Sequence, residues 1–418
     1  MIDHTGPALT SPDHHAWLRL QARGLLDFAR KTMVAGRGAG WLTVDGQVDD
    51  TQAIHTWITA RMVHAFSLGA ILGDAHAREI AQEGLDALRS GPLRDSEHDG
   101  WFASIPVTAG AGEVDSTKSA YAHAFVVLAA SSARVAGLSG AQELLTQGLA
   151  ILEDRFFDAG TGLHVDEWDA SWSVLDDYRG VNANMHAVEA LLAAGDVTGD
   201  PVWHERALGI AKTVALQWAA PNGWRIPEHF SPSWEPLLEF NDDRRADPFK
   251  PYGATVGHGI EWARLLLHLD ATFPGQHPWL QESARSLYSR AIADGWRRST
   301  AGHMGFVYTT GWGGEPIVET RMHWVPAEAL AAASALFTAT SAPFYAKDYE
   351  QWLAHVERFF VDEAHGSWHH ELDTANRPSG TVWPGKPDIY HAIGAFLTPT
   401  VPLSPTLASA LAAQTSGR

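Results

Sequence analysis

The chain has 418 residues, of which 45% are hydrophobic and 19% charged, and its formal net charge of −19 argues against a nucleic-acid-binding surface. It contains no cysteine, which excludes disulfides, thiol catalysis and cysteine-bound zinc. The first 17 residues contain no basic or apolar signal segment, and no run of about 18 apolar residues could span a bilayer, so we expect a cytoplasmic protein that binds neither nucleic acid nor membranes.

A turn-rich, tryptophan-rich segment recurs along the chain with an almost constant spacing. Each copy contains a glycine followed closely by an aromatic residue or a leucine, and successive glycines are 60, 62, 61, 82 and 61 residues apart. Apolar stretches with helical spacing, usually long enough for two helices, lie between the copies. Such a period marks a repeated supersecondary unit. The glycines are Gly40, Gly100, Gly162, Gly223, Gly305 and Gly366.

The repeat predicts an all-α protein, an (α/α)6 barrel in which six helical hairpins form a closed toroid with short β-hairpin-like loops at one face. Because no Pro-, Gly- or Ser-rich linker interrupts the period, we expect residues 1–418 to form a single domain, although length alone would suggest more. Residues 402–418 are expected to be a loosely ordered C-terminal tail. Loops and helix ends converge at one mouth of such a ring, which is where a site is expected.

The more apolar helix of each repeat carries a polar side chain near its start. These helices are expected within residues 56–72, 115–130, 182–195, 256–269, 321–337 and 386–397. The polar markers are Arg61, Tyr121, His186, His258, Glu328 and His391, separated by 60, 65, 72, 70 and 63 residues. Burying an unpaired polar group costs roughly 1–3 kcal/mol, so polar residues at six matching positions indicate a functional site.

Other signals in these segments are weaker. His258 and Glu261 lie three residues apart and therefore share a helix face, whereas we assign His64 and Glu189 to ordinary packing. The chain has 18 tryptophans, most of which we expect in the core, and at least two of which we expect to face a sugar. Phosphate-binding glycine motifs and the GxSxG motif of hydrolases are missing from the sequence.

Four motifs carry a resemblance to a known family. They are NANMHAVEA at 182–190, GHGIEWARLLL at 257–267, WVPAEA at 324–329 and KPDIYH at 386–391. On these motifs the chain resembles the N-acylglucosamine 2-epimerase superfamily over nearly its whole length. The last motif is similar to that of the aldose–ketose isomerase branch, which includes mannose and sulfoquinovose isomerases, whereas 2-epimerases tend to carry a PYHN-type motif there. The resemblance implies an (α/α)6 barrel, in agreement with the six repeats.

The resemblance also implies the site residues. His258 and His391 match the two catalytic histidines of the family. The sugar-binding positions are matched by Arg61, Tyr121, Asn182, His186, Glu261, Trp324 and Glu328. Neither a metal ion nor a cofactor is expected.

The expected chemistry is aldose–ketose isomerisation through an enediol, for which histidine suits both the basic and the acidic role near pH 7. We expect His391 to move the proton between C2 and C1 and His258 to open the sugar ring, with Glu261 tuning His258. Arg61 would stabilise the enediolate oxygen, and Glu328 would hold a hydroxyl group.

The expected substrate is a neutral monosaccharide. The basic residues near the motifs, Arg179, Arg244, Arg245 and Lys250, can pair with neighbouring aspartates, which disfavours a sulfonated sugar. We therefore expect D-mannose and D-fructose to be interconverted, with D-lyxose and D-xylulose as a side reaction. The alternatives are a sulfoquinovose isomerase, a sugar 2-epimerase, an inverting glycoside hydrolase that uses Glu261 and Glu328, or a sugar-binding regulatory protein without catalysis.

Overall fold

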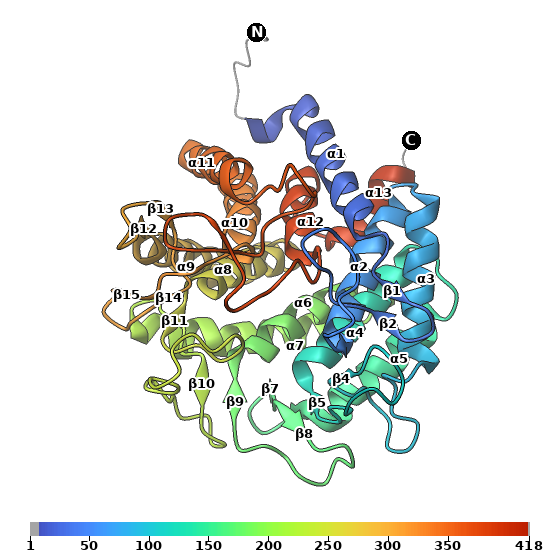
Figure 1. Ribbon diagram of the computed structural model, residues 1–418. Helices are drawn as coiled ribbons and strands as arrows, with labels where there is room; N and C mark the ends of the chain where they lie inside the picture. Colours follow the sequence, from blue (N-terminus) through green and yellow to red (C-terminus); the bar gives the residue numbers. More distant parts are fainter. Residues whose placement is uncertain (1–7, 417–418) are drawn as a thin grey trace.

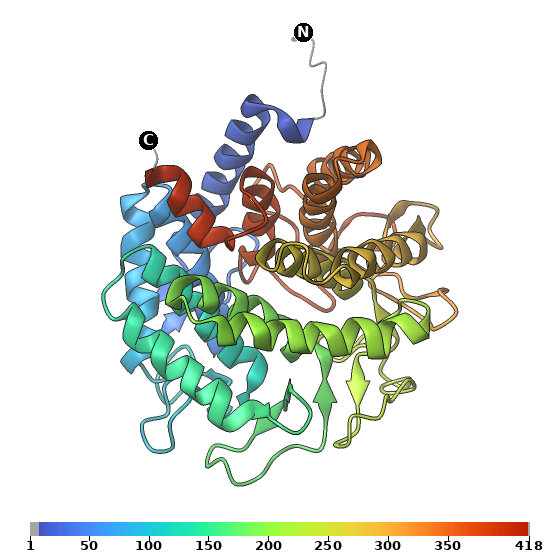
Figure 2. The ribbon, with the colours of Figure 1, turned by 180° about the vertical axis from the view of Figure 1, so that it is seen from behind.

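The structure is a computed structural model that describes residues 8–416. Two concentric rings of helices form an (α/α)6 barrel, as the sequence repeat predicts (Figures 1 and 2). The inner ring consists of α2 (Thr56–Ile71), α4 (Ala120–Val135), α6 (Val181–Thr198), α8 (Val256–Thr272), α10 (Trp324–Thr340) and α12 (Tyr390–Leu397). The outer ring consists of α1 (Pro12–Ala29), α3 (Ala75–Ser90), α5 (Ala141–Ile151), α7 (Pro201–Lys212), α9 (Trp279–Gly295) and α11 (Pro343–Phe359).

Each inner helix packs against an outer one. In five hairpins the outer helix follows its inner partner in the chain, whereas α12 packs against α1, so the two ends of the chain close the ring. Short non-α helices extend or connect these elements: Ala8–Thr10, the π-helical turns Leu152–Phe156 and Thr213–Ala219, Ala220–Asn222 and Thr398–Thr400.

Burial explains the two rings. In α10 every residue from Val325 to Leu336 is buried, as expected of a helix enclosed on all sides. In α3 the buried residues, among them Ile80, Leu85 and Leu88, form one stripe, and the other face is exposed. None of the helices in residues 8–416 combines the length and the apolar character that a membrane crossing requires.

Short antiparallel strands gather at one end of the barrel, which we call the mouth. Five of them run directly, or after one residue, into an inner helix: β3 (Ile54–His55), β5 (Lys118–Ser119), β9 (Arg179–Gly180), β11 (Ala254–Thr255) and β16 (Arg321–Met322). Their partners are β4 (Ser104–Ile105), β8 (Glu167–Trp168), β10 (His229–Phe230), β14 (Thr309–Thr310) with β15 (Pro316–Val318), and β17 (Glu371–Leu372) with β18 (Pro378–Ser379). The remaining pairs are β1 (Met33–Val34) with β2 (Gly38–Ala39), β6 (Phe157–Asp158) with β7 (Leu163–His164), and β12 (Trp296–Arg298) with β13 (Met304–Phe306).

The expectation of a loosely ordered tail is wrong for most of its residues. Residues 407–416 form α13 (Leu407–Ser416), which packs against α2, α4 and α6. Ala410 and Leu411 are buried there, because the small apolar face of this helix covers apolar side chains at the end of the barrel opposite the mouth. Residues 417–418 lie outside the described part of the chain.

Candidate active site

Eight of the nine residues expected in the site line one cavity at the mouth. The cavity encloses about 650 Å³ of empty space. All five inner helices that follow a strand contribute to it, together with α12. These residues are Arg61, Tyr121, Asn182, His186, His258, Glu261, Trp324 and His391, and they come from the first two turns of their helices. Glu328, the ninth, does not line this cavity and lies behind His391.

Two histidine–carboxylate pairs face the cavity. Glu328 Oε1 lies 2.9 Å from Nδ1 of His391, and Glu228 Oε2 lies 3.0 Å from Nδ1 of His258. A neutral imidazole that donates its Nδ1 proton to a carboxylate keeps a lone pair on Nε2, so each histidine can act as a base toward the cavity. Burial is the main reason that the pKa of His391 lies well below its ordinary value, and the positive charge of Arg61 adds to this effect. His391 is therefore neutral near pH 7.

These pairs change two of the expected roles. His258 is held by Glu228, which precedes β10, and not by Glu261, which the sequence analysis expected to tune it. Glu328 holds His391 and Arg264 and has no free oxygen for a sugar hydroxyl. Sequence reasoning missed Glu228 because it lies 30 residues from His258 in an irregular segment without a periodic pattern.

Arg61 is a fixed positive charge in the wall of the cavity. Its Nη1 donates to Asp388 at 3.2 Å, and its Nη2 donates to the Tyr121 hydroxyl at 2.9 Å. The guanidinium carbon also lies 4.8 Å from the ring centre of Trp57 and 4.4 Å from that of Phe125. An arginine held by these contacts loses little freedom when it binds a developing negative charge.

Trp324 lies between the two histidines. Its ring centre is 5.3 Å from that of His258 and 5.8 Å from that of His391, with interplanar angles of 34° in both cases. Gly257 allows this placement, because a Cβ atom at that position would lie 2.1 Å from the indole ring. The indole face and the rings of Trp57, Phe249, Tyr308 and Trp383 give the cavity the aromatic walls on which sugar rings stack.

Several polar atoms of the lining have no hydrogen-bond partner among residues 8–416. They are Oδ1 of Asn182, Oε2 of Glu261 and Nε2 of His323, whereas Nδ1 of His186 lies 3.6 Å from Oε2 of Glu189. Leaving a buried polar group unpaired costs about 1–3 kcal/mol, and proteins accept this cost mainly at functional sites. His323 stacks on His370 with ring centres 3.7 Å apart. The sequence did not point to His323, and His370, in the tract His369-His370-Glu371, was interpreted as part of a loop.

A charged layer lies directly beneath the cavity. Arg264 Nε donates to Glu328 at 2.9 Å, and Arg264 Nη2 lies 3.3 Å from Glu261 and 3.7 Å from Glu189. Burial would lower the pKa of Arg264, but the surrounding carboxylates raise it overall. Burial, together with the negative charge of Glu328, raises the pKa of Glu261 well above its ordinary value.

The layer also contains the atoms best placed to hold a metal ion among the described residues. The ligand atoms of His186, Glu189 and Glu261 lie within 4.8 Å of one another, as do those of Glu261, Glu328 and His391. The guanidinium of Arg264 already compensates these carboxylates and would repel a cation. The residues present therefore fit a metal ion poorly.

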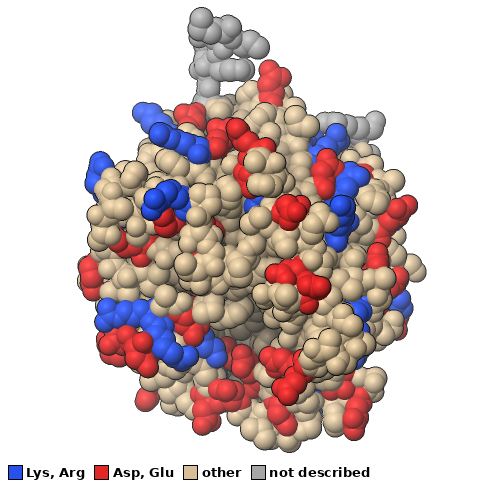
Figure 3. Space-filling view, in the orientation of Figure 1, with Lys and Arg blue, Asp and Glu red and all other residues tan. Residues whose placement is uncertain are grey.

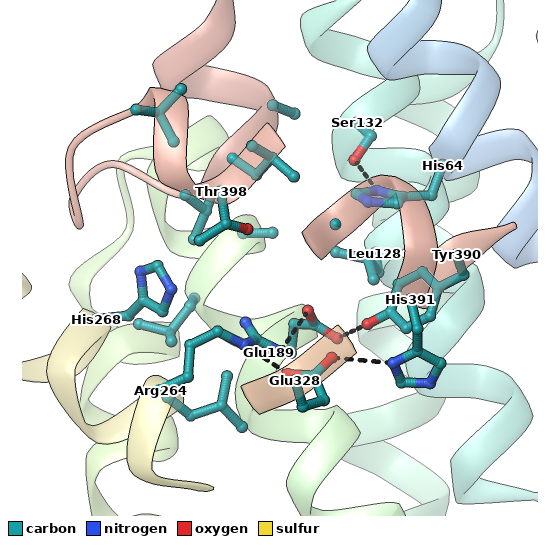
Figure 4. Close-up of a pocket in the computed structure, with 18 residues that line it drawn as sticks. His64, Leu128, Ser132, Glu189, Arg264, His268, Glu328, Tyr390, His391 and Thr398 are labelled. Atoms are coloured by element: carbon teal, nitrogen blue, oxygen red, sulfur yellow. Dashed lines mark hydrogen bonds and ion pairs between the residues drawn. The ribbon is translucent and has the colours of Figure 1, made fainter. Parts of the chain in front are cut away.

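A second cavity of about 740 Å³ lies on the other side of this layer (Figure 4). Arg264, Glu189 and Glu328 form one wall, His268 lies beside Arg264 one turn along α8, and the side chain of His64 lies across the space from them. Leu407 and Ala408 of α13 line its far end. His64 and Glu189, assigned to ordinary packing from the sequence, thus line this inner space.

The basic residues considered for a sulfonated sugar lie outside the mouth cavity. Arg245 pairs with Asp242 at 2.5 Å, and Lys250 Nζ lies 4.0 Å from the ring centre of Tyr178. Arg244 pairs with the nearby Asp247, and Arg179 donates to backbone carbonyls. Near the centre of the space-filling view the surface is hollowed, and most of the surrounding atoms belong to uncharged or acidic residues (Figure 3).

The fold and the cavity together define an (α/α)6-barrel protein with a histidine-rich, aromatic-walled pocket for a small polar molecule. The sequence profile described as N-acylglucosamine 2-epimerase (GlcNAc 2-epimerase) matches residues 38–395. The chain belongs to this family, which confirms the resemblance seen in its motifs.

Individual proteins similar to this chain carry more specific names than the family. The chain is 49% identical over 401 residues to a D-mannose isomerase of Thermobifida fusca, covering 96% of this chain and 97% of the relative. It is 43% identical over 408 residues to a D-mannose isomerase of Pseudomonas cannabina pv. alisalensis, covering 97% of each. A crystal structure of D-mannose isomerase superposes with a TM-score of 0.85 at 28% identity, covering 95% of this chain and 99% of that one.

Proposed function

We propose that this protein is an aldose–ketose isomerase that interconverts D-mannose and D-fructose. The observation that carries the proposal is the pair of histidines, each held at Nδ1 by a carboxylate, on two sides of one cavity. The names of the two relatives support the choice of D-mannose. Because these relatives are matched over nearly their whole length, the proposal concerns the whole chain.

The reaction needs an open sugar chain before any proton leaves carbon. His258 moves the proton between O1 and O5 as the ring opens, and Glu228 keeps its imidazole in the required orientation. Trp324, packed between the histidines, supports the sugar face and holds C1 and C2 near His391.

His391 then performs the proton transfer. Its neutral Nε2 takes the proton from C2, and the electron pair of the C–H bond forms the C1–C2 double bond of the enediolate. The imidazolium is stabilised by Glu328, and the negative charge on the sugar oxygen is stabilised by Arg61. His391 returns its proton to C1, while one proton passes from O2 to O1, which completes the ketose without net proton gain or loss.

The other candidate functions fit the cavity less well. A sulfonated sugar would require a further cation for its sulfonate group, whereas Arg61 is already assigned to the enediolate oxygen and is the only lysine or arginine among the described residues that line the cavity. An inverting glycosidase that used Glu261 and Glu328 would need both carboxylates to face the substrate, but Glu328 does not line the cavity. Asp388 does line it beside Glu261, but its carboxylate is paired with Arg61. A 2-epimerase would return the proton to the opposite face of C2, so the product distinguishes it.

The test is a panel of free sugars followed by NMR in D₂O. We expect D-mannose to give D-fructose with solvent deuterium in the product, and His391→Ala to give none. N-Acetylglucosamine, cellobiose and sulfoquinovose serve as comparison substrates. A tenfold higher kcat/KM for sulfoquinovose, or about 1.4 kcal/mol of transition-state binding, would refute the choice of substrate. Saturable binding without turnover of any sugar would refute the enzyme itself.

A further inference from the structure

We infer that Arg264 is a positioning residue for the proposed reaction, holding Glu328 so that His391 presents Nε2 to the sugar. This inference rests on the proposed function. Arg264 follows Glu261 by three residues in α8 and lines the second cavity, not the mouth cavity (Figure 4). It therefore has no contact with a sugar at the mouth and can act only through its neighbours.

The geometry fixes Glu328 at both oxygens. Arg264 Nε donates to Oε2 at 2.9 Å, and His391 Nδ1 lies 2.9 Å from Oε1. Both partners are buried, which limits the competition of water for these bonds. A carboxylate bound on both sides has one orientation, and the imidazole attached to it has one orientation as well.

Arg264 is itself held by several inner helices. Its Nη2 lies 3.3 Å from Glu261 of α8 and 3.7 Å from Glu189 of α6. Glu189 accepts a hydrogen bond from the hydroxyl of Tyr390, the residue before His391. The guanidinium thus connects α6, α8 and α10 directly and reaches α12 through Glu189.

Removal of this cation has a definite chemical consequence. Glu189, Glu261 and Glu328 would face one another without a counter-charge, and such groups reduce their repulsion by binding a proton. Without Arg264, Oε2 of Glu328 also loses its partner, so the carboxylate no longer has one fixed orientation toward His391. When Glu328 is the group that binds the proton, it donates to Nδ1 of His391, which places the imidazole proton on Nε2. His391 then offers a donor to the sugar instead of a base, and C2 keeps its proton.

The experiment is chemical rescue of Arg264→Ala in the full-length protein. We expect kcat for D-mannose to fall at least about 10²-fold while KM changes by less than about threefold, because sugar contacts stay intact. The truncated side chain opens onto the second cavity of about 740 Å³. Guanidinium chloride at about 20 mM, far below denaturing concentrations, is expected to restore kcat at least tenfold. Urea, a neutral molecule of the same shape, is expected to restore none at equal ionic strength.

Two further variants keep the result interpretable. Arg264→Lys retains the charge without the forked geometry, so its kcat is expected between those of the wild type and Arg264→Ala. Arg225→Ala removes an arginine that pairs with Asp294 outside both cavities, and it should neither lose kcat nor respond to guanidinium. If Arg264→Ala does not fold, as judged by circular dichroism, the kcat of Arg264→Lys alone tests the inference.

The inference is overturned if folded Arg264→Ala or Arg264→Lys keeps wild-type kcat, or if the loss lies in KM. It is also overturned if guanidinium and urea act alike on Arg264→Ala. A wild-type protein without isomerase activity contradicts the proposed function, whereas an active wild type with unaffected Arg264 variants contradicts the inference alone.

Discussion

Glu328→Gln tests the proposed mechanism with the exchange of one oxygen for an amide nitrogen. The native carboxylate accepts from His391 on one oxygen and from Arg264 on the other. An amide has one accepting oxygen, so the variant satisfies only one of these donors. If the amide oxygen of the glutamine faces Arg264, the amide NH₂ group donates to Nδ1 of His391, and the proton of the imidazole moves to Nε2. If the oxygen faces His391, two donors oppose each other at Arg264.

The size of the effect follows from what is lost. A correctly placed general base contributes about 10²- to 10⁴-fold, and the wrong tautomer removes it almost completely. We therefore expect kcat to fall by about 10³-fold, equivalent to about 4 kcal/mol of transition-state stabilisation. KM should change little, since Glu328 does not line the mouth cavity. The variant should fold, because glutamine and glutamate have nearly the same volume.

The assay combines steady-state kinetics on D-mannose with deuterium exchange at C2 and thermal unfolding. Asp294→Asn is the matched control, since Asp294 is a buried carboxylate paired with Arg225 away from both cavities. It should reduce stability without reducing kcat. A folded Glu328→Gln variant with kcat within threefold of the wild type, about 0.65 kcal/mol, would refute the role assigned to the His391–Glu328 pair.

Three further predictions follow from the site. His258→Ala should lose at least about 10²-fold in kcat with cyclic D-mannose while remaining folded, and near-normal turnover would make this histidine structural. Prolonged treatment with a chelator should leave activity intact; loss restored by a divalent ion would contradict the metal-free mechanism. Burial lowers the pKa of His123 to about 3 and those of His186 and His323 to about 4, whereas the unfolded chain titrates near 6.5. The free energy of unfolding contributed by these histidines is thus highest above pH 6.5, and it should fall by up to about 1.4 kcal/mol per histidine at pH 5.5. Urea titrations at the two pH values measure this difference, and an equal free energy of unfolding at both would contradict the buried neutral state of these histidines.

The barrel could be predicted from sequence because its physical causes are local and repeated. The inner helices are mostly apolar and are buried on nearly all sides. A glycine with a positive φ lies in the turn of four of the six repeats, at Gly100, Gly162, Gly223 and Gly366, so the helices and the turns recur with the same period. The longest interval, between Gly223 and Gly305, corresponds to an extra loop at the mouth that includes Phe249. The sequence did not predict helix α13 because its apolar face is small and is buried only by contacts with α2, α4 and α6, which are distant in the sequence.

The candidate site was predictable in its positions and less so in its roles. Polar residues at the starts of enclosed helices could be assigned to the mouth because nothing else explains them there. Glu328 follows Trp324 by four residues, so it lies one helical turn further from the mouth and contacts Nδ1 of His391 from behind. The spacing of residues in the sequence does not show whether such a side chain lines the cavity or lies behind it. Glu228 pairs with His258 through a loop whose course depends on the complete fold. The catalytic assignment of both histidines stays a prediction.

The pairing of α1 with α12 has a consequence for how the protein is made on the ribosome. The inner helix that α1 covers begins 361 residues after α1 ends, at Tyr390 against Ala29, so it is synthesised much later. Until then the buried side of α1 lacks its α12 partner, and His391 is not yet present. A nascent chain therefore carries the buried side of α1 without its α12 partner until residues 390–397 have been synthesised, and it has no complete pocket before then.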